Sequence, residues 1–368
     1  MTVAARSVET VPSRLVDRRP VVPVDRLVAE LVPPRHFTRE SFDTFRPDAG
    51  HPSQQAALDR VRSVATQLTG TGRGPRRLKL GRRRTPPPAV YLDGGFGVGK
   101  THLLASLARA VGPQDSAYGT FVEFTNLVGA LGFAATVAAL GAKRLVCIDE
   151  FELDDPGDTV LMSRLLRELA DRGVALAATS NTLPGSLGEG RFAAEDFLRE
   201  IQALAARFEV VRIDGEDYRH RVFAEAPSTV TDGQAVEAAA RTPGATLDGF
   251  TGLLGHLATF HPSRYGALLD DVALVALTGV TTVTHQDQAL RLVVLVDRLY
   301  DRDVPVLLGG ATGHAVFPAE MLAGGYRKKY LRALSRLSSL AVDGQAAALL
   351  DADAVRGRIS GSVPRADV

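Results

Sequence analysis

Short apolar runs alternate with segments of helical periodicity through most of the chain. Runs of about four to eight apolar residues are typical of buried strands, whereas apolar positions three and four apart predict helices that pack against a sheet. The expected strands are 89–92, 119–124, 145–150, 174–180 and 210–213, and the expected helices are 53–68, 102–111, 158–172 and 194–207. This alternation predicts an α/β fold in which a parallel sheet is flanked by helices.

A weaker form of the same alternation continues beyond residue 221. Strands are expected at 272–280 and 304–309, and helices at 287–300 and 330–340. The order of these elements resembles that of residues 145–180, although the sequence identity is too low to indicate a repeat. We therefore expect a second, smaller domain that is either α/β or mostly helical.

The composition is typical of a globular protein. With 368 residues the chain is long enough for one large and one smaller domain, and 45% of its residues are hydrophobic. Its 43 basic and 42 acidic residues give a net charge of +1, so no charge excess favours nucleic acid or a membrane surface. Only five of the basic residues are lysine, a bias that suggests a GC-rich bacterial genome such as an actinobacterial one.

The sequence predicts a cytoplasmic protein. Cys147 is the single cysteine, which excludes an intrachain disulfide and fits a reducing compartment. No apolar stretch approaches membrane-spanning length, and the N-terminal residues lack the apolar core of a signal peptide. The arginines near the N-terminus are typical of a mitochondrial presequence, but Glu9 and Asp17 are not.

A phosphate-binding motif lies between the first expected strand of the core and the helix that follows it. Residues 94–101 read Gly-Gly-Phe-Gly-Val-Gly-Lys-Thr and fill every fixed position of the P-loop pattern. Backbone N–H groups and the helix N-terminus can cradle phosphates, Lys100 can reach the β- and γ-phosphates, and the Thr101 hydroxyl can bind Mg²⁺. The expected nucleotide-binding residues are Gly94, Gly95, Phe96, Gly97, Val98, Gly99, Lys100 and Thr101. The motif predicts that the chain binds a nucleoside triphosphate.

Polar residues end the next strands. Asp149 and Glu150 close an apolar strand about fifty residues after the P-loop, an arrangement that suits a metal-binding aspartate and a glutamate that activates water. Asn181 ends the following strand and can hold the attacking water near the γ-phosphate. It could also serve as a helix cap or turn residue.

A basic segment precedes the P-loop strand. Residues 70–88 contain seven basic and no acidic side chains. Such a run is either a solvated loop or an electrostatic contact with nucleic acid, anionic lipid or an acidic partner. No aromatic residue lies between the arginines, so the segment offers no platform for stacking bases.

Several motifs together resemble those of the ZapE-type, or AFG-like, AAA+ ATPases. The matching stretches are Cys147-Ile148-Asp149-Glu150-Phe151, Asp155, Asp158, Ala178-Thr179-Ser180-Asn181, Phe197-Leu198, Asp217-Tyr218-Arg219, Asp297-Arg298-Leu299-Tyr300-Asp301, Arg332 and Ser335-Arg336-Leu337. They run through most of the chain from about residue 33. The resemblance implies an AAA+ core, ATP hydrolysis, action as a homo-oligomer and, in bacteria, a link to FtsZ and the division ring.

The chain departs from the family where an arginine is expected. Ala194 stands three residues before Phe197-Leu198, so if one subunit activates another, as the resemblance implies, another arginine must supply the charge. Arg191 is the first candidate, followed by Arg199 and Arg207. Arg332 and Arg336 lie four residues apart and could either fold over the phosphates or form surface salt bridges.

The expected organisation has four parts: an N-terminal extension at 1–50, an ATPase core at 51–225 with a basic loop at 70–88, a lid-like domain at 226–350, and a tail at 351–368. The leading hypothesis is an ATPase that moves or regulates a protein partner. A nucleic-acid-associated ATPase such as a helicase loader, and a nucleotide switch with little hydrolysis, are the alternatives; Glu150 argues against the switch. Nucleic acid is not an expected main partner, and peripheral membrane contact stays open. The eight histidines contain no HExxH pattern, which excludes a fused zinc protease of that type.

Overall fold

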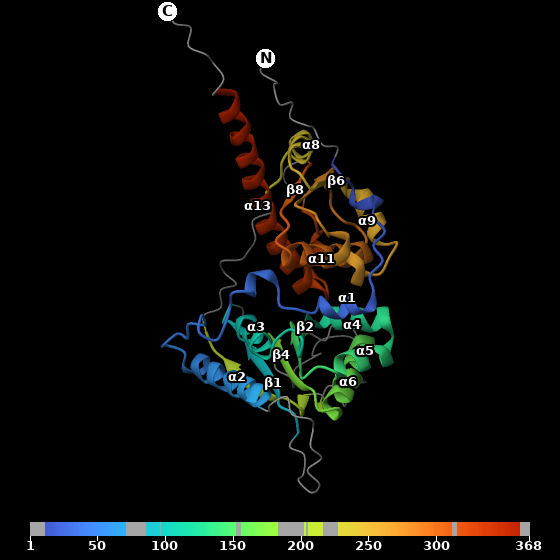
Figure 1. The fold of residues 1–368 in the computed structure, drawn as a ribbon. Coiled ribbons are helices and arrows are strands. Elements are labelled where there is room, and N and C mark those ends of the chain that lie inside the picture. Colours follow the sequence, from blue (N-terminus) through green and yellow to red (C-terminus); the bar gives the residue numbers. More distant parts are fainter. Residues whose placement is uncertain are drawn as a thin grey trace, which may run out of the picture. The chain divides into compact units, whose positions relative to one another are not determined.

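The chain folds into two compact units. The computed structural model describes residues 12–70, 86–95, 97–151, 156–182, 202–203, 205–215, 227–310 and 315–360. One unit is Val22–Arg221, and the other combines Met1–Val21 with Val222–Val368 (Figure 1). The second unit is therefore built from two separate segments of the chain, and the first unit from the segment between them.

The unit that contains the P-loop is built on a five-stranded parallel sheet. Its strands are β1 (Ala89–Gly94), β2 (Ser116–Thr120), β3 (Leu145–Asp149), β4 (Ala175–Ser180) and β5 (Glu209–Ile213), in the order β2-β3-β4-β1-β5. Parallel strands bring all their carboxyl ends to one edge of the sheet, where ligands of α/β proteins bind. Because β4 lies between β1 and β3, Asn181 falls between the P-loop and Asp149 at that edge.

Helices cover both faces of this sheet. Successive side chains of a strand point to opposite faces, and a parallel sheet buries both faces under helices. These helices are α1 (Val24–Ala29), α2 (Pro52–Gly70), α3 (Lys100–Val111), α4 (Phe121–Leu131), α5 (Phe133–Gly141) and α6 (Pro156–Asp171). Helices α2 and α3 lie on one side of the sheet and α4, α5 and α6 on the other (Figure 1). In β3, Leu145 and Cys147 pack with α2 and α3, whereas Val146 and Ile148 pack with α4, α5 and α6. The predicted parallel sheet with flanking helices is confirmed.

The strand expected at 119–124 is wrong over most of its length. Strand β2 ends at Thr120, and helix α4 begins at Phe121. The Thr120 hydroxyl accepts a hydrogen bond from the Glu123 N–H at 3.3 Å, and the Glu123 carboxylate accepts one from the Thr120 N–H at 2.6 Å. This reciprocal cap satisfies two N–H groups at the helix start and outweighs the β-propensity of the apolar run.

The second unit contains its own parallel sheet, in the order β6-β7-β8. Its elements are α8 (Asp232–Arg241), β6 (Ala245–Gly249), α9 (Phe250–Leu257), α10 (Tyr265–Leu268), β7 (Leu274–Thr278), α11 (Gln286–Asp301), β8 (Val306–Leu308), α12 (Ala319–Ala323) and α13 (Arg327–Ser360). Side chains of β7 pack with α9, α11 and α13 on one face and with α8 on the other. The smaller domain is thus of the α/β kind, and α13 continues past residue 351.

A segment near the N-terminus is built into this second unit. Ser13 pairs with Thr246 of β6, and the Leu15 side chain is fully buried. The Asp248 carboxylate accepts hydrogen bonds from the Leu15 N–H at 2.9 Å and the Val16 N–H at 3.0 Å. We call residues 13–19 the N-terminal strap.

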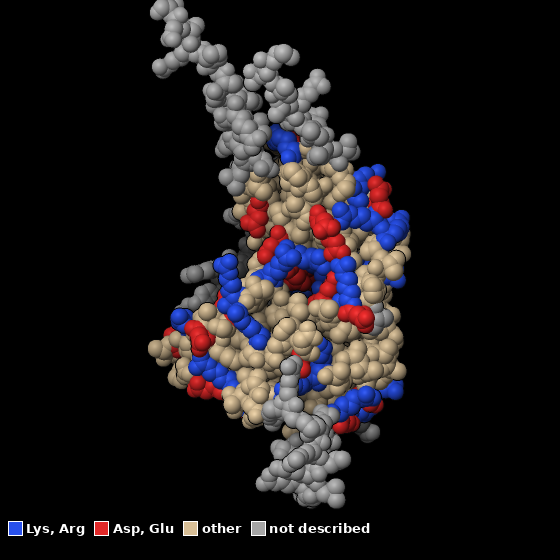
Figure 2. Space-filling model, viewed as in Figure 1, with Lys and Arg blue, Asp and Glu red and all other residues tan. Residues whose placement is uncertain are grey.

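The surface carries charges of both signs. Figure 2 shows basic and acidic side chains next to one another on the face in view. No single helix in the described ranges is long and apolar enough to cross a membrane. Helices α4 and α5 meet that criterion of length and composition only as a pair bent by 119°.

Candidate active site

Glycines shape the P-loop because its backbone leaves no room for side chains. Gly97 and Gly99 have φ angles of 80° and 90°, in the left-handed region that favours glycine. A Cβ at Gly94 would lie 2.2 Å from the Ile213 carbonyl oxygen, and one at Gly99 would lie 2.4 Å from the Phe45 ring. Helix α3 starts directly after this loop, so its first N–H groups face the loop. Phe96 lies outside the described residues.

Lys100 connects the P-loop to strand β4. It is only 9% exposed, and its ammonium donates hydrogen bonds to the carbonyl oxygens of Gly94 and Gly95. The third donor reaches Asn181 Oδ1 at 2.8 Å. These three acceptors satisfy a buried charge that would otherwise be costly. Phosphate oxygens of a bound nucleotide can replace the same acceptors.

Asp149 lies at the end of β3 on the same side of the sheet as α3, and is 6% exposed. Its Oδ1 accepts hydrogen bonds from the hydroxyls of Thr101, at 3.2 Å, and Thr179. Its Oδ2 accepts one from the Tyr118 hydroxyl at 2.7 Å. Burial, with a further contribution from Asp149, raises the pKa of Tyr118 well above its ordinary value, so the phenol stays a donor.

The Thr101 and Asp149 oxygens fit the magnesium ion that a P-loop site implies. Mg²⁺ prefers oxygen ligands and is commonly held by one or two protein groups together with substrate phosphates and water. A hydroxyl and a carboxylate 3.2 Å apart, next to the P-loop, form such a donor set. Thr101 and Asp149 would therefore hold the ion.

Glu150 directly follows strand β3 and has a left-handed conformation, with a φ of 52°. Such a backbone is uncommon for a residue with a side chain and persists only when its surroundings impose it. The Glu150 N–H donates to Thr179 Oγ1 at 3.0 Å, and the Phe151 N–H donates to the Thr179 carbonyl at 2.7 Å. Phe151 is fully buried, with its ring centroid 5.4 Å from that of Phe121 and 6.2 Å from that of Tyr91. These contacts fix the backbone on either side of Glu150.

Asn181 directs its side chain to the P-loop lysine. Its Oδ1 accepts the hydrogen bond from Lys100. The next residue, Thr182, is held by two further hydrogen bonds. The Tyr91 hydroxyl donates to the Thr182 carbonyl at 2.7 Å, and the Thr182 N–H donates to Ser180 Oγ at 3.0 Å. These contacts fix the backbone at the end of β4.

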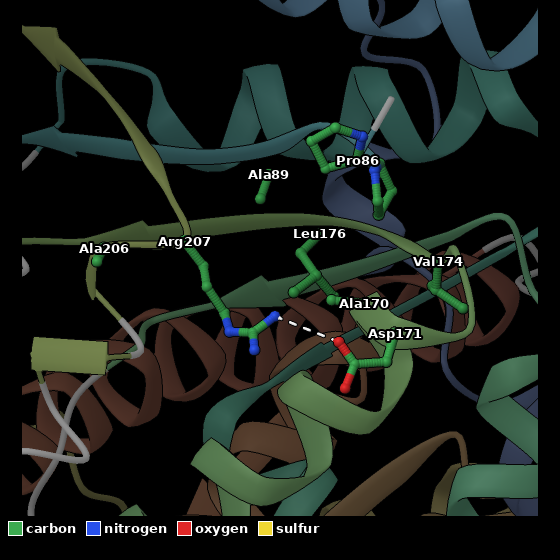
Figure 3. Close-up of a pocket in the computed structure, with 9 residues that line it drawn as sticks. Pro86, Ala89, Ala170, Asp171, Val174, Leu176, Ala206 and Arg207 are labelled. Carbon is green, nitrogen blue, oxygen red and sulfur yellow. Dashed lines mark ion pairs between the residues drawn. The ribbon is translucent and has the colours of Figure 1, made fainter. Parts of the chain in front are cut away.

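Of the arginines proposed to act on a neighbouring subunit, Arg207 alone lies among the described residues, and it is not at this edge of the sheet. Arg191 and Arg199 lie outside the described part of the chain. Arg207 pairs with Asp171 at 3.7 Å beside a cavity of about 320 Å³ (Figure 3). The residues that line the cavity are Pro86, Pro87, Ala89, Ala170, Asp171, Val174, Leu176, Ala206 and Arg207. They lie where β1 and β4 begin, at the edge of the sheet opposite the P-loop.

Arg332 and Arg336 are held within the second unit. Both donate to Asp297, at 2.9 Å and 2.5 Å, and the Arg336 guanidinium lies 5.0 Å from the Tyr300 ring centroid. Their side chains are 24% and 19% exposed, so this is a largely buried ion-pair cluster rather than a surface salt bridge. Their action on phosphates stays a prediction.

Sequence reasoning missed Tyr118 and gave Thr179 no role of its own. Thr179 lies two residues before Asn181, and alternation along β4 would have placed it on the opposite face from Ala178. Tyr118 pairs in register with Cys147 and shares its face of the sheet with Asp149. A strand predicted at 116–120 instead of 119–124 would have placed Tyr118 on the same face of the sheet as Asp149.

Known proteins match part of this chain. The chain is 30% identical over 155 residues to the cell division protein ZapE of Escherichia coli K12, across 39% of this chain and 41% of that protein. It is 27% identical over 157 residues to an uncharacterised protein of Schizosaccharomyces pombe, across 36% of this chain and 33% of that protein. The chain thus spans less than half the length of these relatives.

Similarity to solved structures is lower. Domain III of the Thermotoga maritima replication initiation protein DnaA is 18% identical, with a TM-score of 0.35 over 55% of this chain and 71% of that chain. The profile of the AFG1-like ATPases, in contrast, matches residues 21–242 and 225–347, which include the P-loop, Asp149 and Asn181. A match over most of the chain, on a P-loop α/β unit, shows that the protein belongs to the AFG1-like ATPase family.

Proposed function

We propose that the chain hydrolyses ATP and uses turnover to remodel or regulate a protein partner. One observation carries this proposal: Lys100 and Thr101, at the start of α3, form hydrogen bonds with Asn181 and Asp149, at the ends of β4 and β3. The phosphate cradle, the metal-binding oxygens and a water-binding amide are thereby within reach of one nucleotide.

Each residue has a distinct role in this proposal. Lys100 and the loop N–H groups bind the β- and γ-phosphates, and Thr101 and Asp149 hold the metal ion. A bound magnesium ion would neutralise charge on the phosphates. Asn181 orients the attacking water, and Glu150 accepts its proton. Glu150 follows the buried strand β3 and is itself partly exposed.

An arginine from a neighbouring copy completes the site in this proposal. Positive charge near the transferred phosphoryl group speeds hydrolysis strongly. Arg191 is the preferred candidate, with Arg199 next. Arg207 is less favoured, because it pairs with Asp171 at the opposite edge of its own sheet. ATP-dependent self-association follows from this proposal.

The partner is proposed to be a protein of the division machinery, with FtsZ as the candidate that the family resemblance suggests. Support comes from the ZapE relative, whose name describes a cell division protein. A pull-down with Glu150→Gln in ATP, compared with Lys100→Ala, tests this proposal. We expect the first variant to retain a protein that the second does not. Equal recovery with both variants, or recovery of DNA that disappears with added salt, would contradict the proposal.

A further inference from the structure

Two groups of donors fix the Asp149 carboxylate, one on each oxygen. Oδ1 faces the Thr101 and Thr179 hydroxyls and the Glu150 N–H. Oδ2 accepts a hydrogen bond of 2.7 Å from the hydroxyl of Tyr118, which lies on the neighbouring strand β2. Since a carboxylate can rotate about its Cβ–Cγ bond, a donor that holds Oδ2 also decides where Oδ1 points.

Tyr118 is itself held rigidly. Its side chain is 3% exposed, packed in the core between the sheet, α2 and α3. Its N–H donates to the Leu31 carbonyl at 2.8 Å, which ties the edge strand β2 to the segment that follows α1. With both Tyr118 and Asp149 buried, bulk water has little access to replace the phenol. The hydroxyl therefore sits at a fixed point relative to β3.

We propose that Tyr118 is a positioning residue that aims Asp149 at the metal ion of the ATP site. This inference rests on the proposed function and adds a residue to it. Some residues form a hydrogen bond to a metal ligand without contacting the metal themselves. Removing such a residue typically lowers metal affinity about 10-fold to 100-fold. The phenol would not touch ATP or the metal; it would act through the carboxylate alone.

The test is the Tyr118→Phe variant, which removes one hydroxyl and keeps the ring. The matched control is Tyr265→Phe, which removes a buried phenol that donates to the Leu257 carbonyl at 2.6 Å in the other unit. Binding of a fluorescent ATP analogue is measured in EDTA and then against Mg²⁺ concentration, without reference to turnover.

We expect Tyr118→Phe to bind the analogue in EDTA within about twofold of wild type, while its Mg²⁺ midpoint rises about tenfold. Tyr265→Phe should match wild type in both measurements. An unchanged midpoint in Tyr118→Phe, with a Mg²⁺ response in wild type, would overturn this inference alone. Absence of any Mg²⁺-dependent binding in wild type would overturn the inference and the proposed function together.

A second measurement does not depend on the folding of the variant. A 3-fluorotyrosine incorporated at position 118 alone reports the hydrogen bond through its ¹⁹F resonance. We expect that resonance to shift when Mg²⁺ is added to the nucleotide complex, and to stay in place when Mg²⁺ is added without nucleotide. A resonance that does not shift when Mg²⁺ is added to the nucleotide complex would show that the phenol only stabilises the fold.

Discussion

Two buried charges at the carboxyl edge of the sheet, Lys100 and Asp149, are held by hydrogen bonds from separate elements. Lys100 bonds the P-loop and β4, whereas Asp149 bonds β2, β4 and α3. Burying a charge is unfavourable unless it is fully partnered, so each contact has to be in place in the folded state. The site is therefore organised before any nucleotide arrives, which lowers the cost of reorganisation during the reaction.

Asn181 tests this organisation at the scale of one side chain. Asn181→Ala should lower ATP turnover by about a hundredfold, because the water would lose its orienting amide. ATP affinity should stay within about threefold, because the loop and Lys100 bind the phosphates. Asn126→Ala, on α4, is the control, and steady-state turnover with equilibrium binding is the measurement. Lost affinity with normal turnover per bound ATP would mean that Asn181 is structural.

Residues of the site were predictable from sequence where they belong to one continuous motif. The P-loop, Asp149-Glu150 and Asn181 each follow an apolar strand, so their positions at the sheet edge follow from the α/β pattern. Tyr118 was not predictable in this way. Its contact with Asp149 joins residues 31 positions apart on neighbouring strands, and it depends on the register of β2 against β3.

At the scale of elements, the misassigned start of α4 has an identifiable cause. The apolar residues at 119–124 suited a strand, but Thr120 and Glu123 carry the Ser/Thr-x-x-Glu signature of a helix start. In this segment the capping residues, and not the apolar run, decide the local structure. The N-terminal strap had no comparable signal, because its bonds to Asp248 join residues more than 230 positions apart.

The strap should stabilise the second unit. Leu15 is fully buried in that core, so Leu15→Ala should lower the free energy of unfolding by about 2–5 kcal/mol. Val21→Ala, at a side chain that is 83% exposed, is the matched control and should change little. Hydrogen exchange of β6, β7 and β8 in the full chain is the measurement. Equal protection in both variants would show that the strap is bound only loosely.

The contact between the strap and α9 should depend on pH. His256 lies against Arg19, with Nδ1 2.9 Å from a guanidinium nitrogen, and its Nε2 is 3.0 Å from the Arg18 carbonyl. Burial, and then Arg19, lower the pKa of His256 below its ordinary value of 6.5, whereas the hydrogen bond to the Arg18 carbonyl, and then Asp248 and Asp17, act in the opposite direction. The folded state thus favours the neutral ring, whose stabilisation is complete above pH 6.5 and is lost as pH falls through the lowered pKa.

Thermal unfolding measured from pH 7.5 to 5 should therefore show a stability loss that is smaller in His256→Gln than in wild type. His285→Gln changes an exposed histidine and should retain the full loss. The pKa of His261 is also lowered, by burial and then by Arg291 and Arg264. His261 therefore adds a loss of stability at low pH in all three proteins. Identical pH profiles for wild type and His256→Gln would contradict the proposed contact.

At the scale of the whole molecule, the proposal predicts association driven by ATP. If Arg191 of one copy completes the site of another, Glu150→Gln with ATP should form a larger species in light scattering. Arg191→Ala should lose turnover by about a thousandfold with affinity nearly intact. Mixing it with Lys100→Ala protein should restore part of the activity. A strict monomer at micromolar concentration, or no rescue in the mixture, would contradict action between copies.

In the proposed function, one edge of the sheet in the first unit binds and hydrolyses ATP. Its most direct test measures binding and turnover of radiolabelled ATP side by side for wild type, Lys100→Ala and Glu150→Gln. We predict that wild type binds and hydrolyses, Lys100→Ala does neither, and Glu150→Gln binds with near wild-type affinity but turns over at least a hundredfold more slowly. Wild-type turnover in Glu150→Gln, or unchanged binding in Lys100→Ala, would show that ATP is not hydrolysed at this edge in the way proposed.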